Sequence, residues 1–162
     1  MVKDSCWGYL SCYDLAYYKG RVRDISSSCQ GEKACYTLAG NYGTIGHISG
    51  SCVKSYSCGW AAEENGRIGD ISGSCQGEFS CYDMAWIHGT VGDISSSCNS
   101  YKACQGAASD YGSISDGIKE GCNSARACLE LGQNSTLDGQ IDQCCNTEGS
   151  CEGISSLPAR RL

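Results

Sequence analysis

Paired cysteines are the residues of this chain whose chemistry is easiest to interpret. The 162-residue sequence contains 15 cysteines, and fourteen of them form seven pairs whose members lie six positions apart. The pairs are Cys6 and Cys12, Cys29 and Cys35, Cys52 and Cys58, Cys75 and Cys81, Cys98 and Cys104, Cys122 and Cys128, and Cys145 and Cys151. Such a cysteine content is typical of disulfide-braced proteins in an oxidising compartment. Zinc sites usually need closer cysteine pairs and histidines, so we expect disulfides and neither a metal nor a cofactor.

Counting distinguishes two ways of pairing these cysteines. Bridges between equivalent cysteines of successive repeats would leave one of seven unpaired in each column, whereas pairing within each repeat uses all fourteen. Positions six apart can face each other across a glycine bend, for which Gly8, Gly31 and Gly77 provide the residue. We therefore predict seven intra-repeat disulfides. Cys144 is left over, either as a free thiol or as a partner in an intermolecular bridge.

Serines in four repeats form the first candidate binding surface. If the cysteine that follows them points inward, strand alternation places both serines of each repeat outward. Two rows of hydroxyl groups would then lie on a flat face: Ser26, Ser28, Ser49, Ser51, Ser72, Ser74, Ser95 and Ser97. Such a face could match ice, a mineral or a crystalline polysaccharide. The alternative, which we favour, is that serine is merely tolerated on a solvated strand.

A second column holds Asp24, His47, Asp70 and Asp93. Stacked carboxylates repel one another, and a cation such as Ca²⁺ could relieve that repulsion. Aspartate is also common in bends because its side chain bonds the local backbone. We favour this second interpretation.

The third column is aromatic and contains Tyr13, Tyr36 and Tyr82, with Gly59 followed by Trp60 in the remaining copy. Ten tyrosines against one phenylalanine indicate rings that keep a polar edge in water. Exposed rings can stack on sugars or form a protein interface. They can also stack on one another and stabilise the column. Both interpretations stay open.

Catalysis is the function class to weigh against binding. Many right-handed β-helices act on acidic polysaccharides through clustered carboxylates and cations, and Arg21, Arg23, Arg67, Asp24 and Asp70 could lie near one another. A catalytic site breaks a repeat, whereas these residues follow it. We therefore predict a protein that is not an enzyme, and keep a polysaccharide-active β-helix as an alternative.

The pairs recur every 23 residues, with one step of 24 between Cys98 and Cys122, and such a period is the signature of a solenoid. Helical repeats would need amphipathic runs that this chain lacks. Short β-branched segments between glycines predict an all-β parallel β-helix of about seven coils, each with three short strands. Coils of this length favour the right-handed form. We expect regular repeats over residues 1–128, and a degenerate last repeat with a C-terminal cap over residues 129–162.

Charge and processing signals limit the partners and the location. The net charge of −6 argues against nucleic acid as a partner, and the apolar runs are too short for membrane insertion. The start, Met-Val-Lys-Asp, is not a signal peptide, so a secreted protein would have had a leader removed. Asn134-Ser135-Thr136 is a glycosylation sequon that agrees with a secretory route. The open N-terminal coil is expected to dock on a partner or a missing segment.

The motif S-C-x-G-x-x-[SA]-C, followed by G-x-I-G-D-I-S, resembles cysteine-paired tandem repeats in predicted secreted proteins of algae and other microbial eukaryotes. The resemblance covers residues 5–128 and implies the repeat type without an activity. In general design the chain also resembles the disulfide-braced β-solenoids of insect antifreeze proteins, without their threonine ladder. We expect a secreted, extracellular, non-enzymatic scaffold that presents repeated faces to a surface, a glycan or an assembly partner. Ice binding through the serine rows is the alternative.

Overall fold

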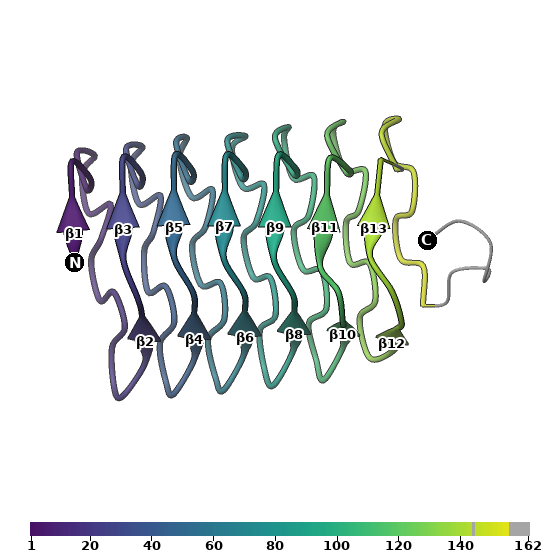
Figure 1. The fold of residues 1–162 in the computed structure, drawn as a ribbon, viewed down its shortest axis with the longest axis horizontal. Coiled ribbons are helices and arrows are strands. Elements are labelled where there is room, and N and C mark those ends of the chain that lie inside the picture. Colours follow the sequence, from purple (N-terminus) through teal and green to yellow (C-terminus); the bar gives the residue numbers. More distant parts are fainter. Residues whose placement is uncertain (144, 156–162) are drawn as a thin grey trace.

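A computed structural model describes residues 1–143 and 145–155 of the chain as a parallel β-solenoid (Figure 1). Every strand is two residues long. The strands are β1 (Val2–Lys3), β2 (Arg21–Val22), β3 (Ile25–Ser26), β4 (Thr44–Ile45), β5 (Ile48–Ser49), β6 (Arg67–Ile68), β7 (Ile71–Ser72), β8 (Thr90–Val91), β9 (Ile94–Ser95), β10 (Ser113–Ile114), β11 (Ile118–Lys119), β12 (Thr136–Leu137) and β13 (Ile141–Asp142). Cys144 and residues 156–162, which include part of the predicted C-terminal cap, lie outside the described residues.

The strands form two parallel sheets that run the length of the solenoid. The odd-numbered strands follow one another in a seven-stranded sheet, and the even-numbered strands form a six-stranded sheet. Equivalent residues of successive coils are paired, as in Ile25 with Ile48. The step of 24 is accommodated in the bend between β10 and β11, where residues 115–117 replace the two residues found between β8 and β9. Ile94 and Ile118 therefore stay in register.

The third side of each coil is a run of turns, so the prediction of three strands per coil was wrong on this side. In the second coil, Lys33, Thr37 and Ala39 have φ values of 50–55°. Alternate N–H groups bond the previous coil, as Cys35 does to the carbonyl of Ser11 at 2.7 Å. The intervening groups close turns within the coil, as Tyr36 does to Lys33 at 3.2 Å. Left-handed conformations cost about 1–2 kcal/mol per residue, a strain that bonding between coils must offset.

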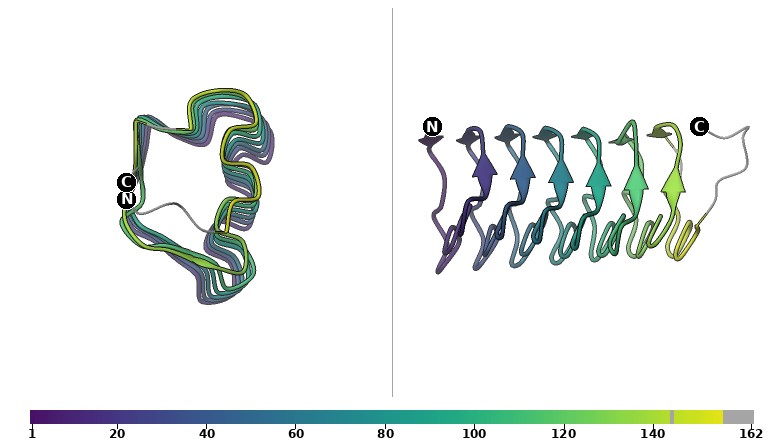
Figure 2. Two further views of the ribbon diagram at one scale, coloured as in Figure 1. Left: turned by 90° about the vertical axis from the view of Figure 1, so that its right-hand side faces the viewer. Right: turned by 90° about the horizontal axis from the view of Figure 1, so that it is seen from below.

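The solenoid is left-handed. Seen from the C-terminal end, the odd-numbered strands run up one side, and the chain then crosses the top and descends along the turn-rich side while it approaches the viewer (Figure 2, left). A chain that turns clockwise while it comes toward the viewer forms a left-handed coil. The expected right-handed sense came from solenoids with three extended strands in each coil. The analogy fails because one side of this coil is built from turns.

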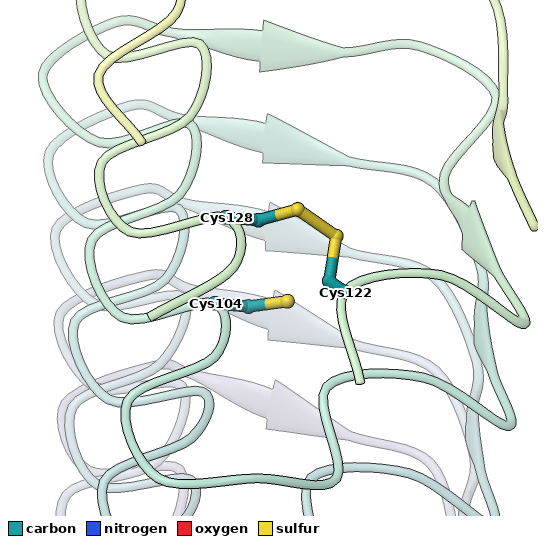
Figure 3. A group of neighbouring side chains, drawn as sticks. All are labelled: Cys104, Cys122 and Cys128. Carbon is teal, nitrogen blue, oxygen red and sulfur yellow. A yellow bond between two sulfur atoms is a disulfide. The ribbon is translucent and has the colours of Figure 1, made fainter. Parts of the chain in front are cut away.

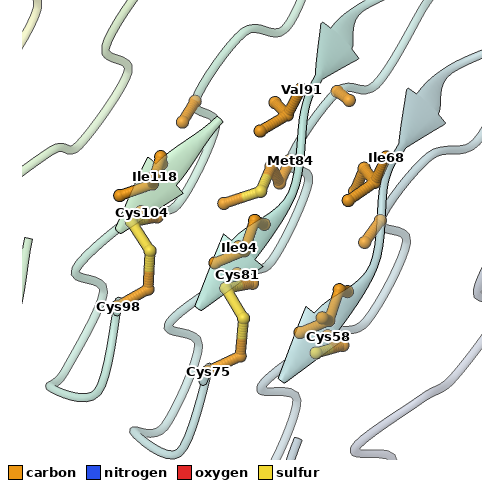
Figure 4. Packing of buried hydrophobic residues seen from close by; sticks show 14 of the residues in the cluster. Cys58, Ile68, Cys75, Cys81, Met84, Val91, Ile94, Cys98, Cys104 and Ile118 are labelled. Carbon is orange, nitrogen blue, oxygen red and sulfur yellow. A yellow bond between two sulfur atoms is a disulfide. The ribbon is translucent and has the colours of Figure 1, made fainter. Parts of the chain in front are cut away.

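The core is a stack of disulfides, isoleucines and alanines (Figure 4). All seven predicted intra-repeat disulfides are present, with Cα–Cα separations of 5.5–5.7 Å. Each closes a short loop and stabilises the fold by about 2–3 kcal/mol on a chain-entropy estimate. Glycine is needed where coils approach most closely, because a Cβ atom on Gly43 would lie 1.6 Å from the carbonyl oxygen of Ala62.

Candidate functional site

The inner serine row faces the core, which corrects its predicted outward placement. Ser28, Ser51, Ser74 and Ser97 are fully buried. The Oγ of Ser28 donates to the carbonyl of Ser26 at 2.7 Å and accepts from the N–H of Ser51 at 3.1 Å. Strand alternation fails at this corner because Ser27 and Cys29 have φ values of 48° and 57°. Only the row of Ser26, Ser49, Ser72 and Ser95 reaches the surface.

The aspartate column forms hydrogen bonds from coil to coil. The Oδ1 of Asp70 accepts the N–H of His47 at 2.7 Å, and the Oδ1 of Asp93 accepts the N–H of Asp70 at 2.8 Å. A Cβ atom at position 46 would lie 2.1 Å from the Oδ1 of Asp70. Glycine at position 46 therefore leaves the room that the Asp70 carboxylate needs. These bonds agree with the interpretation of the aspartates as bend residues.

Asp24 begins this column and bonds two other groups. Its Oδ1 accepts from the amino group of Met1, and its Oδ2 lies 3.2 Å from the Nδ1 of His47. The hydrogen bond from the amino group, together with the positive charges nearby, holds the pKa of Asp24 below its usual value. Asp24 is exposed, so its contacts with Met1 and His47 contribute little to the stability of the fold.

The tyrosine column is a continuous stack of rings. Tyr13 and Tyr36 stack with centroids 5.5 Å apart and planes 11° apart. Trp60 fills the place of the missing tyrosine, 6.5 Å from Tyr36 and 5.5 Å from Tyr82. Its plane is tilted by 45° and 34° against these two neighbours, and 39% of Trp60 stays exposed. The rings therefore stabilise the coils, as one of the two interpretations predicts, and Trp60 also presents surface to solvent.

A second aromatic column was missed in the sequence. Tyr56 and Phe79 stack with centroids 5.1 Å apart, and the Nζ of Lys33 donates to the hydroxyl of Tyr56 at 2.6 Å. This hydrogen bond raises the pKa of Lys33. The three residues are 23 positions apart, so the period itself was the signal that could have revealed them.

Two hollows lie on the turn-rich side, on either side of Trp86. The larger, of about 300 Å³, is lined by Tyr36, Thr37, Trp60, Glu63, Glu64 and Trp86. The smaller, of about 160 Å³, is lined by Asp83, Trp86, Gln105, Gly106, Ser109, Asp110, Glu130 and Gln133. We call the two together the Trp60–Trp86 groove. Sequence reasoning missed this site because its residues depart from the repeat.

Two carboxyl groups of the groove, those of Asp83 and Glu63, have raised pKa values. Burial, with a contribution from the charge of Glu63, raises the pKa of Asp83 to about 6. Burial and the neighbouring Glu64 raise the pKa of Glu63. Among the described residues, the Oδ1 of Asp83 and the Oε1 of Gln105 are buried without a hydrogen-bond partner. Both residues line the smaller hollow, and these two oxygen atoms lie just beneath its surface.

The charged residues considered for catalysis are only partly brought together. Arg23, Asp70 and Asp93 line a hollow of about 380 Å³ beside β4 and β6. The carboxylates of Asp70 and Asp93 each already accept a backbone N–H there. Arg21 and Arg67 occupy β2 and β6, with Thr44 of β4 between them in the sheet.

Three sulfur atoms that belong to the fifth and sixth disulfides form a tight group (Figure 3). Those of Cys104, Cys122 and Cys128 lie within 4.8 Å of one another. Cys122 is bonded to Cys128, and Cys104 is bonded to Cys98. A cysteine binds a metal ion through its thiolate, so these three cysteines offer no metal ligands while their disulfides are intact.

The architecture that carries these columns is a tandem repeat with one cysteine pair in each coil. In the described part of the chain, no helix has the length and apolar character needed to cross a membrane. A scan against protein-family models gives no match, and searches of curated proteins and of solved structures likewise give none.

Proposed function

We propose that this protein is a secreted, non-enzymatic recognition scaffold, and that it binds a glycan in the Trp60–Trp86 groove. One observation carries the proposal. The repeated polar residues bond from coil to coil, whereas Trp60 and Trp86 depart from the repeat and border open hollows. Residues that build the solenoid recur in every coil, so residues that differ from the repeat are the candidates for a role in binding.

Seven disulfides and a repeated hydrogen-bond network suit such a scaffold. They indicate an oxidising environment. Secretion to the cell exterior is part of the proposal, and the exposed position of Asn134 in the sequon agrees with it. The resemblance to repeats of predicted secreted algal and protist proteins points the same way.

The lining of the groove supports a sugar as ligand. Aromatic rings offer apolar faces to the carbon–hydrogen side of a sugar, and Trp60 is tilted out of its stack with 39% exposed. Carboxylate and amide oxygens, such as those of Glu63 and Gln105, accept hydrogen bonds from hydroxyl groups. Ligand sites commonly combine apolar walls with a few polar groups in this way.

A glycan array probed with the protein and with two variants tests the proposal. Trp60→Ala and Trp86→Ala should each reduce binding by about tenfold or more, the equivalent of 1.4 kcal/mol. Tyr111→Ala is the matched control, because Tyr111 is 70% exposed and lines neither hollow. Absence of glycan binding by the unaltered protein, or equal losses in all three variants, would reject the groove as a glycan site.

Ice binding is the second candidate, and strand register supports it. Ser26, Ser49, Ser72 and Ser95 lie on four successive strands in exact pairing, at the regular spacing of a parallel sheet. Thermal hysteresis and crystal shape in a cooled droplet would test it, with Ser49→Lys as the disrupting variant. Ice crystals that grow as they do in buffer would remove this candidate.

A further inference from the structure

The charge and hydrogen-bonding character of the Trp60–Trp86 groove narrow the ligand further. We propose that its ligand is an amino-sugar polymer with free ammonium groups, which extends along the solenoid axis across Trp86. This inference rests on the proposed glycan-binding function and specifies the class of glycan.

The groove is lined by acids on both sides of Trp86. Glu63 and Glu64 line the larger hollow. Asp83, Asp110 and Glu130 line the smaller one. Neither set of lining residues includes a lysine, an arginine or a histidine. An acidic polysaccharide would be repelled here, whereas an ammonium group would be attracted, most strongly where the site is partly desolvated.

The polar atoms of the smaller hollow are mainly acceptors. The Oδ1 of Asp83 and the Oε1 of Gln105 are buried and have no donor among the described residues. Two nearby donors are already used: the Oγ of Ser109 donates to the carbonyl of Asp83 at 2.6 Å, and the Nε2 of Gln133 donates to Asp110 at 2.8 Å. A buried acceptor left unsatisfied is costly. A ligand rich in N–H and O–H donors would supply the missing hydrogen bonds once the Asp83 and Gln105 side chains turn toward the hollow that they line.

The aromatic residues favour a cation as well. Indole rings are the best aromatic partners for an ammonium group, which binds over the ring face. Two tryptophans and Tyr36 border the larger hollow together with Glu63 and Glu64. The same chain already places lysines over rings, as with Lys33 over Tyr56 at 5.1 Å.

The length of the groove indicates a polymer. Glu63, Trp86, Ser109 and Gln133 are equivalent positions of four successive coils, and all line one hollow or the other. Three coil steps of about 4.8 Å each separate the first from the last. A small amine would fill one hollow only, whereas an extended chain of sugars reaches both.

Calorimetric titration with three oligosaccharides of equal length tests this inference. The probes are the hexamers of glucosamine, of N-acetylglucosamine and of galacturonic acid. We expect the glucosamine hexamer to bind at least about tenfold more tightly than the N-acetylated one, a difference of 1.4 kcal/mol. Its affinity should fall as salt rises, because exposed charges are screened.

The double variant Glu63→Gln/Glu64→Gln should abolish that preference, so that the glucosamine and N-acetylglucosamine hexamers bind it with equal affinity. Asp142→Asn is the control, because it removes a charge from the exposed β13 surface. Circular dichroism would verify that each variant is folded. A preference that survives the double variant would contradict the role of these carboxylates.

The outcomes separate the two proposals. Equal or tighter binding of the N-acetylated or galacturonic hexamer keeps the glycan function and overturns the ammonium inference. Equal binding of a lysine hexapeptide overturns the sugar specificity. If none of the hexamers binds and the glycan array is also blank, the proposed function fails and this inference fails with it.

Discussion

The Oγ of Ser28 accepts a hydrogen bond from the N–H of Ser51, its equivalent in the next coil, at 3.1 Å. The same relationship joins Ser51 to Ser74 and Ser74 to Ser97. Backbone groups at this corner lie inside the protein and need partners, and the serine hydroxyls supply them. Much of the repetition in this chain thus reflects hydrogen bonds between successive coils, and for this reason we propose that recognition belongs to residues that break the repeat.

The hydrogen bonds of the buried serine row are therefore expected to stabilise the fold. Ser74→Ala removes the acceptor of the Ser97 N–H and the donor to the Ser72 carbonyl. Leaving a buried donor unsatisfied should lower the free energy of unfolding by about 1–3 kcal/mol. Urea unfolding with the disulfides intact measures it. Ser72→Ala, on the exposed row, is the control and should change stability by less than about 0.5 kcal/mol; similar losses at both positions would disprove the distinction.

Gly46 and Asp70 should be energetically coupled. A Cβ atom at position 46 would displace the Asp70 carboxylate from the N–H of His47, because it would lie 2.1 Å from the Oδ1. Gly46→Ala and Asp70→Ala should each destabilise the fold, and the double variant should cost less than their sum by about 0.5 kcal/mol or more. A double-mutant cycle from thermal unfolding measures the coupling. Strict additivity would show that glycine is needed for another reason.

Asp83 should make the stability depend on pH. Its pKa is raised from 3.8 to about 6 in the folded protein, so the folded state holds more protons than the unfolded state between these values. The free energy of unfolding should therefore fall as pH rises from about 4 to 6. Asp83→Asn should flatten this dependence and stabilise the protein at pH 7 by about 1 kcal/mol, allowing for solvent screening. If the free energy of unfolding of this variant depends on pH as it does in the unaltered protein, Asp83 is not the group responsible for that dependence.

Reduction should begin at the ends of the disulfide stack. Cys6 and Cys12 of the first pair and Cys145 and Cys151 of the last are only partly buried, whereas the cysteines of the five pairs between are fully buried. Exchange needs access of a thiolate to a disulfide sulfur. Limited reduction followed by alkylation and mass spectrometry should therefore label the two terminal pairs first. Early labelling of Cys75 and Cys81 would show that the coils open independently.

The cysteine pairing and the parallel stacking were predictable because they depend on counting and on period. Seven identical spacings left one pairing that used every member, and Ile25, Ile48 and Ile71 recur at the interval that a stacked coil requires. Neither the number of cysteines nor the period of the repeat depends on how the chain turns within a coil. The aromatic stack was partly predictable for the same reason, although Trp60 reaches it from one position beyond Gly59.

The corner between Ser26 and Cys29 shows what the sequence left undetermined. Strand alternation predicted that Ser28 points outward, but positive φ values at Ser27 and Cys29 turn both Ser28 and Cys29 inward. The same left-handed backbone replaces the third strand with turns and invalidates the analogy that suggested a right-handed coil. Glycine occupies the position of Ser27 in two other coils, as Gly50 and Gly73 with φ values of 54° and 52°, and was the only residue type that indicated the turn. Nothing in the type of Cys29 indicated a positive φ value.

The sequence by itself thus determined the period, the disulfides and which residues stack in columns. Only the tertiary structure decided which columns are buried, the handedness of the coil and the groove beside Trp60 and Trp86. The physical reason is that a repeat specifies neighbours at a fixed interval along the axis. The direction in which a side chain points depends on backbone conformations that bonding between coils imposes.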